Sequence, residues 1–152
     1  MKVMGKNSLS SIIKLGLQVI FILGTLVIIF LPWCLKWYLS FFSRNEGYYY
    51  AMLAILYTSG VLALFIIYKF ILMFKTLKLN NPFVNENVRN LQHISFSCCI
   101  IAIIYFIAIF VFSSVFTAVI FMIFTIAFLG AYILAEVFRQ AVEYKEENDL
   151  TI

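Results

Sequence analysis

Three long stretches of the chain contain no charged residue and are mostly apolar. No Asp, Glu, Lys or Arg occurs in residues 15–35, 47–68 or 90–135, which are 21, 22 and 46 residues long. A helix that spans the hydrocarbon core of a bilayer needs about 20 apolar residues. The first two stretches therefore predict one spanning helix each, and the third predicts two.

The polar residues that flank and interrupt these stretches define the ends of the helices. Ser113 and Ser114 form the polar break in the third stretch, so a turn is expected there. The predicted spans are residues 11–32, 50–74, 94–112 and 117–135, arranged as two hairpins. Small or weakly polar side chains, which let helices approach and form hydrogen bonds, are Gly16, Gly24, Thr25, Tyr57, Thr58, Ser59 and Gly60.

The composition agrees with this pattern. Hydrophobic residues make up 64% of the chain and charged residues 12%, about half the charged share of a soluble globular protein. A soluble domain of 152 residues could not bury so much apolar surface. We therefore expect one all-α integral-membrane domain over residues 1–152, with its spans packed as a four-helix bundle. The first span is expected to remain uncleaved, because no small-x-small cleavage site follows it.

The Lys and Arg residues are divided unevenly between the two sides that this topology defines. Nine lie on the side of the termini and of the loop at residues 75–93, namely Lys2, Lys6, Lys14, Lys69, Lys75, Lys78, Arg89, Arg139 and Lys145. Only Lys36 and Arg44 lie on the other side. Because cytoplasmic loops carry an excess of Lys and Arg, both termini are expected in the cytoplasm. Topology thus accounts for the net charge of +4, and direct binding of nucleic acid is not expected.

The loop at residues 75–93 is the only long polar segment between spans. Asn81 is expected to cap a helix that has Pro82 at its first position and runs through His93 into the third span. Val84, Val88 and Leu91 repeat at i, i+4 and i+7, which predicts an amphipathic helix that lies on the membrane or docks a partner. The partner-binding residues predicted in this loop are Asn81, Pro82, Phe83, Asn85, Glu86 and Arg89.

Residues 136–152 are expected to extend the fourth span as a cytoplasmic helix. Glu136 and Glu143 lie three and four residues from Arg139, a spacing that stabilises an exposed helix by a few tenths of a kcal/mol per pair. The acidic end is expected to approach the basic Lys78 and Arg89, and a solvated tail is the alternative. The thin apolar face of the tail is Val137, Ala141 and Tyr144, and its predicted partner-binding residues are Glu136, Arg139, Glu143, Glu147 and Asp149.

Aromatic residues gather in residues 33–50, between the first two spans. Pro32 is expected to open a short helix in the membrane plane, with Leu35, Tyr38, Leu39 and Phe42 facing lipid. The side chains that could contact a peptide or a lipid-like ligand are Trp33, Trp37, Tyr38, Phe42 and Tyr49. The favoured alternative is an aromatic belt that anchors the first hairpin at the interface.

Lys69, His93 and the cysteines are isolated residues with reactive side chains. Lys69 lies about one turn inside its span, where an ionisable group suggests function but a lysine also reaches the interface easily. His93 has no second His or carboxylate nearby, which favours an interfacial role. Cys34 is too far in depth from the Cys98–Cys99 pair for a disulfide. No cofactor, metal site or catalytic residue is predicted.

Two motifs carry a resemblance to a known family. The first is Asn81-Pro82-Phe83 followed by Asn85, Asn87 and Arg89, and the second runs from Ala135-Glu136-Val137-Phe138 to Glu147-Asn148-Asp149-Leu150-Thr151-Ile152. Together they resemble a bacterial membrane family catalogued as domain of unknown function 2975, over essentially the whole chain. The resemblance implies a place in the bacterial cytoplasmic membrane. Members are often encoded beside a very small helix-turn-helix regulator, which implies the membrane half of a regulatory pair.

The sequence is compatible with three classes of function, of which one is disfavoured. The favoured class is a non-enzymatic sensor or regulator that binds a cytoplasmic partner, such as a small helix-turn-helix DNA-binding protein. The second is a membrane ligand-binding or protective protein, for antimicrobial-peptide immunity or attached to a transporter. An enzyme or autonomous transporter is disfavoured, because the spans hold no carboxylate, His pair or metal-ligand cluster and show no clear repeat. The lipid bilayer is an expected partner in each case, and a homo-oligomer is left open.

Overall fold

Four long helices form the fold in the computed structural model, which describes residues 6–41, 46–78 and 83–150. They are α1 (Lys6–Phe41), α2 (Tyr49–Lys78), α3 (Asn85–Phe112) and α4 (Val115–Leu150), and a short 3-10 helix, η1 (Glu46–Tyr48), precedes α2. Each helix has a segment long and apolar enough to cross a membrane. The prediction of an all-α fold with four helices that could span a membrane is therefore confirmed.

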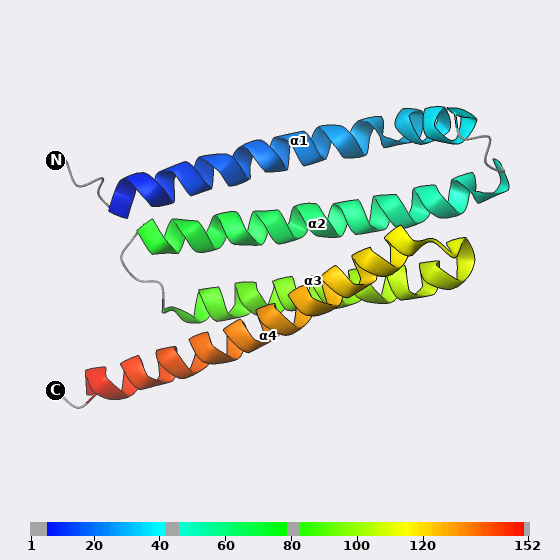
Figure 1. Ribbon diagram of the computed structural model, residues 1–152. Helices are drawn as coiled ribbons and strands as arrows, with labels where there is room; N and C mark the ends of the chain where they lie inside the picture. Colours follow the sequence, from blue (N-terminus) through cyan, green and yellow to red (C-terminus); the bar gives the residue numbers. More distant parts are fainter. Residues whose placement is uncertain (1–5, 42–45, 79–82, 151–152) are drawn as a thin grey trace.

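Helices α1, α2 and α3 lie in a row in the order of the chain, and α4 crosses α3 obliquely (Figure 1). The extensive contacts join α1 to α2, α2 to α3 and α3 to α4. The two predicted hairpins are thus present, but the row is open and does not close into a four-helix bundle. The start of α1 and the end of α4 lie at one end of the molecule, here called the terminal end (Figure 1). The opposite end, where both hairpins turn, is called the hairpin end.

The position of α3 in the row explains which parts of the molecule are buried. Because α2 and α4 pack on two sides of α3, the buried residues of the fold are concentrated on this helix. Ile94 and Cys98 of α3 form a core cluster with Ala131 of α4, against which Phe70 of α2 packs. By contrast, most apolar side chains of α1 are exposed on the protein surface. Such a surface is suited to contact with lipid chains.

The sequence pattern predicted that the first helix ends at Pro32, and this prediction is wrong. The helix continues through this proline to Phe41, because a backbone in lipid has no water to bond and keeps its hydrogen bonds inside the helix. Pro32 lacks an N–H and bends the helix, and the last turns of α1 leave the line of the preceding turns (Figure 1). Leu35 and Leu39, predicted to face lipid, are 6% and 4% exposed and belong to the protein interior.

The third helix also differs from the prediction at its start. It begins at Asn85 with Val84 as the N-cap residue, and no side chain caps it. The prediction of a helix start with Pro82 at its first position is therefore wrong, and Asn81 and Pro82 themselves lie outside the described residues. The expected continuity of this segment with the third span is confirmed, because a single helix covers residues 85–112.

The turn between α3 and α4 lies where the sequence predicted it. Ser113 is the C-cap residue of α3, with φ 45° and ψ 39° in the left-handed region, and its N–H bonds to the carbonyl of Ile109 2.9 Å away. This conformation ends a helix by satisfying one of its last carbonyls. Val115 then starts α4, so the connection is two residues long.

Glycine residues determine how closely α1 approaches α2. A Cβ atom on Gly24 would lie 2.9 Å from Cδ2 of Leu64, and one on Gly60 would lie 3.2 Å from the side chain of Ile28. Small residues in this position let two spanning helices pack backbone to side chain. The predicted role in helix approach is thus confirmed for Gly24. It does not hold for Gly16, since a Cβ there would have nothing within 4 Å.

Replacing Gly24 with isoleucine is expected to lower the free energy of unfolding by about 1–3 kcal/mol, the usual cost of overpacking. The matched control is Gly16→Ile on the same helix, where the new side chain meets no neighbour. Both changes alter helix propensity equally, so their difference reports the contact with α2. The measurement is unfolding of the purified protein in mixed micelles by added dodecyl sulfate. Equal midpoints for the two variants would contradict close packing at Gly24.

Candidate functional site at the terminal end of α3 and α4

Four polar residues of α3 are buried in the protein. Asn87, Asn90, Ser95 and Ser97 are 1% to 4% exposed. The sequence pattern had assigned Val84, Val88 and Leu91 to an apolar stripe that lies on the membrane or docks a partner. Val88 and Leu91 are instead buried within the protein, and Val84 is half-buried. The asparagines are buried as well because α3 has a neighbour on each of two sides.

Asn87 joins α3 to α2 through a hydrogen bond to Thr76. The Asn87 side-chain Nδ2 donates to Thr76 Oγ1 at 2.8 Å. The Thr76 hydroxyl in turn lies 2.7 Å from the carbonyl oxygen of Met73 and 3.0 Å from Asn87 Oδ1, to either of which it donates its proton. Buried polar groups are stable only when they are bonded in this way. The pair therefore holds the first turns of α3 against the last turns of α2.

Two further polar contacts hold α3 in the row. The Ser59 hydroxyl of α2 lies 3.4 Å from the Tyr105 hydroxyl, and Ser95 Oγ donates to the Phe128 carbonyl of α4 at 3.3 Å. The contact of Ser59 was expected from its polar patch, although Thr58 of the same patch bonds back to Ala54. Asn90 differs from these residues, because its buried Nδ2 has no hydrogen-bond partner within the described residues.

The segment before α3 packs against the last turns of α4. The rings of Phe83 and Phe138 have centroids 5.4 Å apart, and Asn85 Nδ2 donates to Glu146 Oε1 at 3.3 Å. A cleft of about 230 Å³ lies between the two segments and is lined by Phe83, Val84, Asn85, Val142, Lys145 and Glu146. The predicted approach of the loop and the tail is therefore present at these residues.

The approach does not use the basic residues that the sequence suggested. Arg89 is exposed, and it forms no ion pair in the part of the chain that the structure describes. Glu86 is also exposed. The side chains of Lys78 and Asp149 lie outside the described residues, so their expected attraction remains a prediction. An aromatic contact and an amide–carboxylate hydrogen bond join the segments in place of Arg89.

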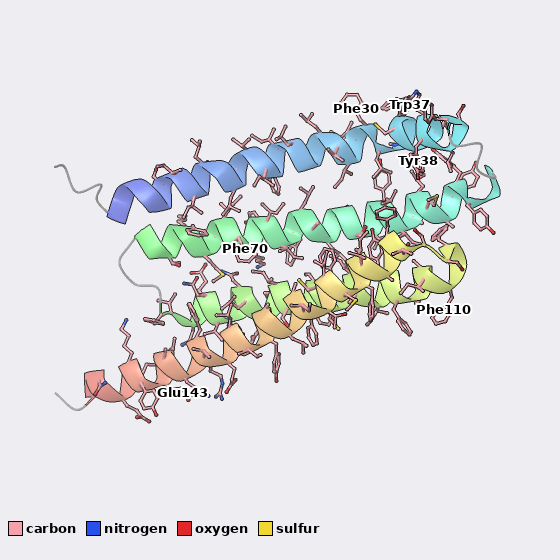
Figure 2. The ribbon with its side chains drawn as sticks, in the orientation of Figure 1. Phe30, Trp37, Tyr38, Phe70, Phe110 and Glu143 are labelled. Atoms are coloured by element: carbon pink, nitrogen blue, oxygen red, sulfur yellow. The ribbon has the colours of Figure 1, made fainter. Side chains whose placement is uncertain are left out.

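The last turns of α4 have one face packed on the protein and one face exposed. Val142 is 4% exposed on the packed face, whereas Val137 and Tyr144 are 53% and 69% exposed. Beside them, Arg139 bridges Glu136 and Glu143, with its NH1 donating to Glu143 Oε1 at 2.7 Å. The predicted ion pairs along the tail are thus confirmed. Figure 2 shows Glu143 on the side of α4 that points away from α3.

An open pocket lies on this exposed face. It has a volume of about 290 Å³ and is lined by Gln140, Glu143, Tyr144 and Glu147. We call the surface formed by these four residues and Val137 the tail surface. It combines exposed apolar groups with carboxylates.

Aromatic side chains crowd the hairpin end, as predicted. Trp33 and Trp37 are 67% and 70% exposed, and Trp37 stacks on Phe41 with ring centroids 5.6 Å apart. Figure 2 shows Trp37 pointing away from α2 and Tyr38 lying on the side of α1 that faces α2. Tyr49 packs edge-on against Tyr50 and has the Lys36 amine 5.9 Å from its ring centroid. Phe42 lies outside the described residues.

A second cleft opens among these residues at the hairpin end. It has a volume of about 260 Å³ and is lined by Leu39, Tyr48, Met52, Val111, Phe112 and Ser113. The ring of Tyr48 meets that of Phe112 edge-on at 5.9 Å. Among the described residues, Trp33, Trp37, Tyr38 and Tyr49 of the predicted ligand-facing set do not line this cleft, and the extension of α1 turns Leu39 toward it.

Within the described residues, no three His, Cys, Asp or Glu side chains are grouped so that they could hold a metal ion. A family model described as protein of unknown function (DUF2975) matches residues 14–152. The chain belongs to this family. No curated protein and no solved structure matches it.

The DUF2975 match covers α1 from Lys14 onward, the whole of α2, α3 and α4, the segment before α3 and the tail surface. The resemblance based on the loop and tail motifs is thereby confirmed. Phe83 and Asn85 of the first motif contact Phe138 and Glu146 in the region of the second, and Asn87 bonds to α2. The motif residues of this family member are therefore, in part, packing residues at the terminal end.

Proposed function

We propose that this DUF2975 protein is a non-enzymatic membrane regulator that binds a cytoplasmic protein on the tail surface. The excess of Lys and Arg around the terminal end supports a cytoplasmic location for it. The observation that carries the proposal is the exposure of Val137 and Tyr144 beside Glu143, on a helix that extends beyond the apolar run of α4. Exposed apolar side chains with a charged rim are typical of protein-binding surfaces.

The charge of this segment suits a basic partner. Residues 136–149 hold five acidic side chains (Glu136, Glu143, Glu146, Glu147 and Asp149) against two basic ones (Arg139 and Lys145), a net charge of −3. Complementary charge steers association and disfavours wrong partners. A small helix-turn-helix DNA-binding protein has the positive surface that matches it. The acidic surface would repel DNA itself, so the partner and not the membrane protein would contact nucleic acid.

Contacts between helices at the terminal end hold the tail surface in a fixed position for such a partner. The contacts of Phe83 with Phe138 and of Asn85 with Glu146 fix α4 beside α3. The Asn87–Thr76 hydrogen bond links α3 in turn to α2. A change in the packing of the spans would therefore move the tail surface. This continuity supports regulation of the partner by an event in the membrane.

A pull-down from the native host with a tag on the N-terminus, in mild detergent, tests the proposal. We expect recovery of a small basic DNA-binding protein, with its affinity reduced about five- to thirty-fold by Tyr144→Ser, because loss of one interface anchor costs about 1–2 kcal/mol. The matched control is Tyr132→Ser, which removes a tyrosine of similar exposure, 62%, from the apolar part of α4. Equal recovery with Tyr144→Ser, or no such protein after crosslinking, would contradict the proposal.

The second function supported by an observation is binding of an apolar ligand at the hairpin end. The observation is the cleft between Leu39, Met52 and Phe112, surrounded by exposed tryptophan and tyrosine side chains. Such surroundings suit an antimicrobial peptide or a lipid-like compound, and a protective or transporter-accessory role would follow. Recovery of a transporter, or of lipid alone, in the same pull-down would favour this second function.

A further inference from the structure

We infer that Lys69 and His93 form a binding site for the phosphate of an anionic phospholipid, on the face shared by α2 and α3. The two side chains meet at the ring of Phe65. The Lys69 Nζ lies 5.2 Å from the centroid of that ring, and the His93 ring packs edge-on against it at 6.3 Å. Two residues from different helices are thereby held on one exposed face. This site lies apart from the tail surface and does not depend on the proposed function.

The depth of the pair in the membrane follows from the register of the helices. The contacts of Ser59 with Tyr105 and of Thr76 with Asn87 fix α2 and α3 as antiparallel neighbours. Counting seven residues back from Thr76 and seven forward from Asn87 puts Lys69 level with residue 94, next to His93. Both residues are therefore at the same depth.

This depth is greater than that of the basic residues at the membrane boundary. The same counting puts Lys75 of α2 level with residue 88, beside Arg89 of α3. Lys69 lies six residues deeper than Lys75, and His93 four deeper than Arg89, or about 9 and 6 Å at the rise of a helix. A lysine at this depth reaches lipid phosphate with its long side chain.

Lys69 forms no ion pair with a carboxylate within the described residues. Helix α2 contains no Asp or Glu at all, and Glu86, the only carboxylate of α3, lies seven residues from His93 toward the terminal end. Cations inside a membrane are stable when they pair with an opposite charge. Basic sites between spanning helices at the cytoplasmic side accordingly bind anionic headgroups.

One exposed face of α3 has a polar part followed by a long apolar part, the same order as the headgroup and acyl chains of a phospholipid. We call this face the exposed stripe. Arg89, Gln92 and His93 are exposed at its terminal end. Phe96, Ile103 and Ile107 continue the stripe toward the hairpin end and are 66%, 54% and 59% exposed. A headgroup at the polar part would lay its acyl chain along the apolar part. Charge and apolar length therefore both favour a phospholipid over a free phosphate ion.

Native mass spectrometry of the full chain in mild detergent tests this inference. The protein is titrated with phosphatidylglycerol or with phosphatidylcholine, and the bound lipids are counted. We expect phosphatidylglycerol to bind at least about ten-fold more tightly, and Lys69→Gln to remove about ten-fold of that affinity, as for one charge-assisted hydrogen bond. His93→Gln is expected to weaken phosphatidylglycerol binding as well, and neither change should alter phosphatidylcholine binding.

Lys36→Gln is the matched control. It removes a lysine that also lies over an aromatic ring, 5.9 Å from the centroid of Tyr49, but at the hairpin end. We expect this variant to bind phosphatidylglycerol like the unchanged protein. Equal binding of the two lipids, an equal loss with Lys36→Gln, or displacement of phosphatidylglycerol by millimolar inorganic phosphate would overturn the inference. Thermal unfolding of each variant in the same detergent identifies any variant that loses the fold. If Lys69→Gln loses the fold, His93→Gln provides the test.

Discussion

Replacing Ile101 with alanine is expected to lower the free energy of unfolding by about 2–5 kcal/mol. Ile101 has an exposed fraction of 0% and lies on α3, which packs against both α2 and α4. Lipid chains are as apolar as the protein interior, so the loss arises from packing contacts and not from transfer out of water. A cavity enclosed between helices cannot be filled by lipid, and its lining loses those contacts.

The matched control for this prediction is Ile103→Ala, two residues further along α3. Ile103 is 54% exposed on the lipid-facing stripe, where an acyl chain can occupy the space that the side chain leaves. We expect its cost to stay below about 0.5 kcal/mol, as for surface substitutions. The midpoints of dodecyl sulfate unfolding in mixed micelles measure both variants. A larger loss for Ile103→Ala would mean that this stripe is covered by protein.

The number and order of the helices could be read from the sequence because charged residues are excluded from the hydrocarbon core. The charge-free stretches therefore indicated each span. Helix ends were less accessible to this reasoning. Pro32 suggested an end, yet the helix continues through it, since a backbone in lipid keeps its hydrogen bonds within the helix wherever it can. Polar residues near the ends of the spans likewise remain helical.

The candidate site was predicted only in part, for a reason that lies in the position of α3. An amphipathic pattern assumes one buried face, and Val88 and Leu91 fit it. A helix with neighbours on two sides buries more of its surface, so Asn87 and Asn90 are inside the protein as well. The only signal for this was the frequency of asparagine near the start of α3. Local spacing worked better where no tertiary contact interferes, as with Arg139 and its two glutamates.

The contact between the loop and the tail also could not be predicted from local sequence, because it is a tertiary contact. Opposite charges suggested that Arg89 would meet the acidic end of α4. The segments meet through Phe83 with Phe138 instead, because burial of aromatic surface is worth more than an exposed ion pair, whose value is about 0–1 kcal/mol. Arg89 thus stays exposed on the surface.

Replacing Asn87 with alanine is expected to lower the free energy of unfolding by about 1–3 kcal/mol. Its side chain is 1% exposed and donates a 2.8 Å hydrogen bond to Thr76, so the change removes a buried contact between α2 and α3 and leaves a cavity. Thr76 retains the Met73 carbonyl as acceptor, which keeps the cost below that of an orphaned polar group. Gln92→Ala, which removes an exposed amide side chain from the same helix, is the control and should cost less than about 0.5 kcal/mol.

A double-mutant cycle separates the hydrogen bond from the cavity. Thr76→Val removes the hydroxyl but keeps a branched side chain, and the double variant with Asn87→Ala should be more stable than additivity predicts by about 1 kcal/mol. Each free energy comes from unfolding in mixed micelles. Strict additivity would mean that the two side chains do not interact. In that case α3 would be held against α2 by apolar packing alone. The link from the spans to the tail surface would then have to pass through the core cluster and through Phe70, which Figure 2 shows between α2 and α3.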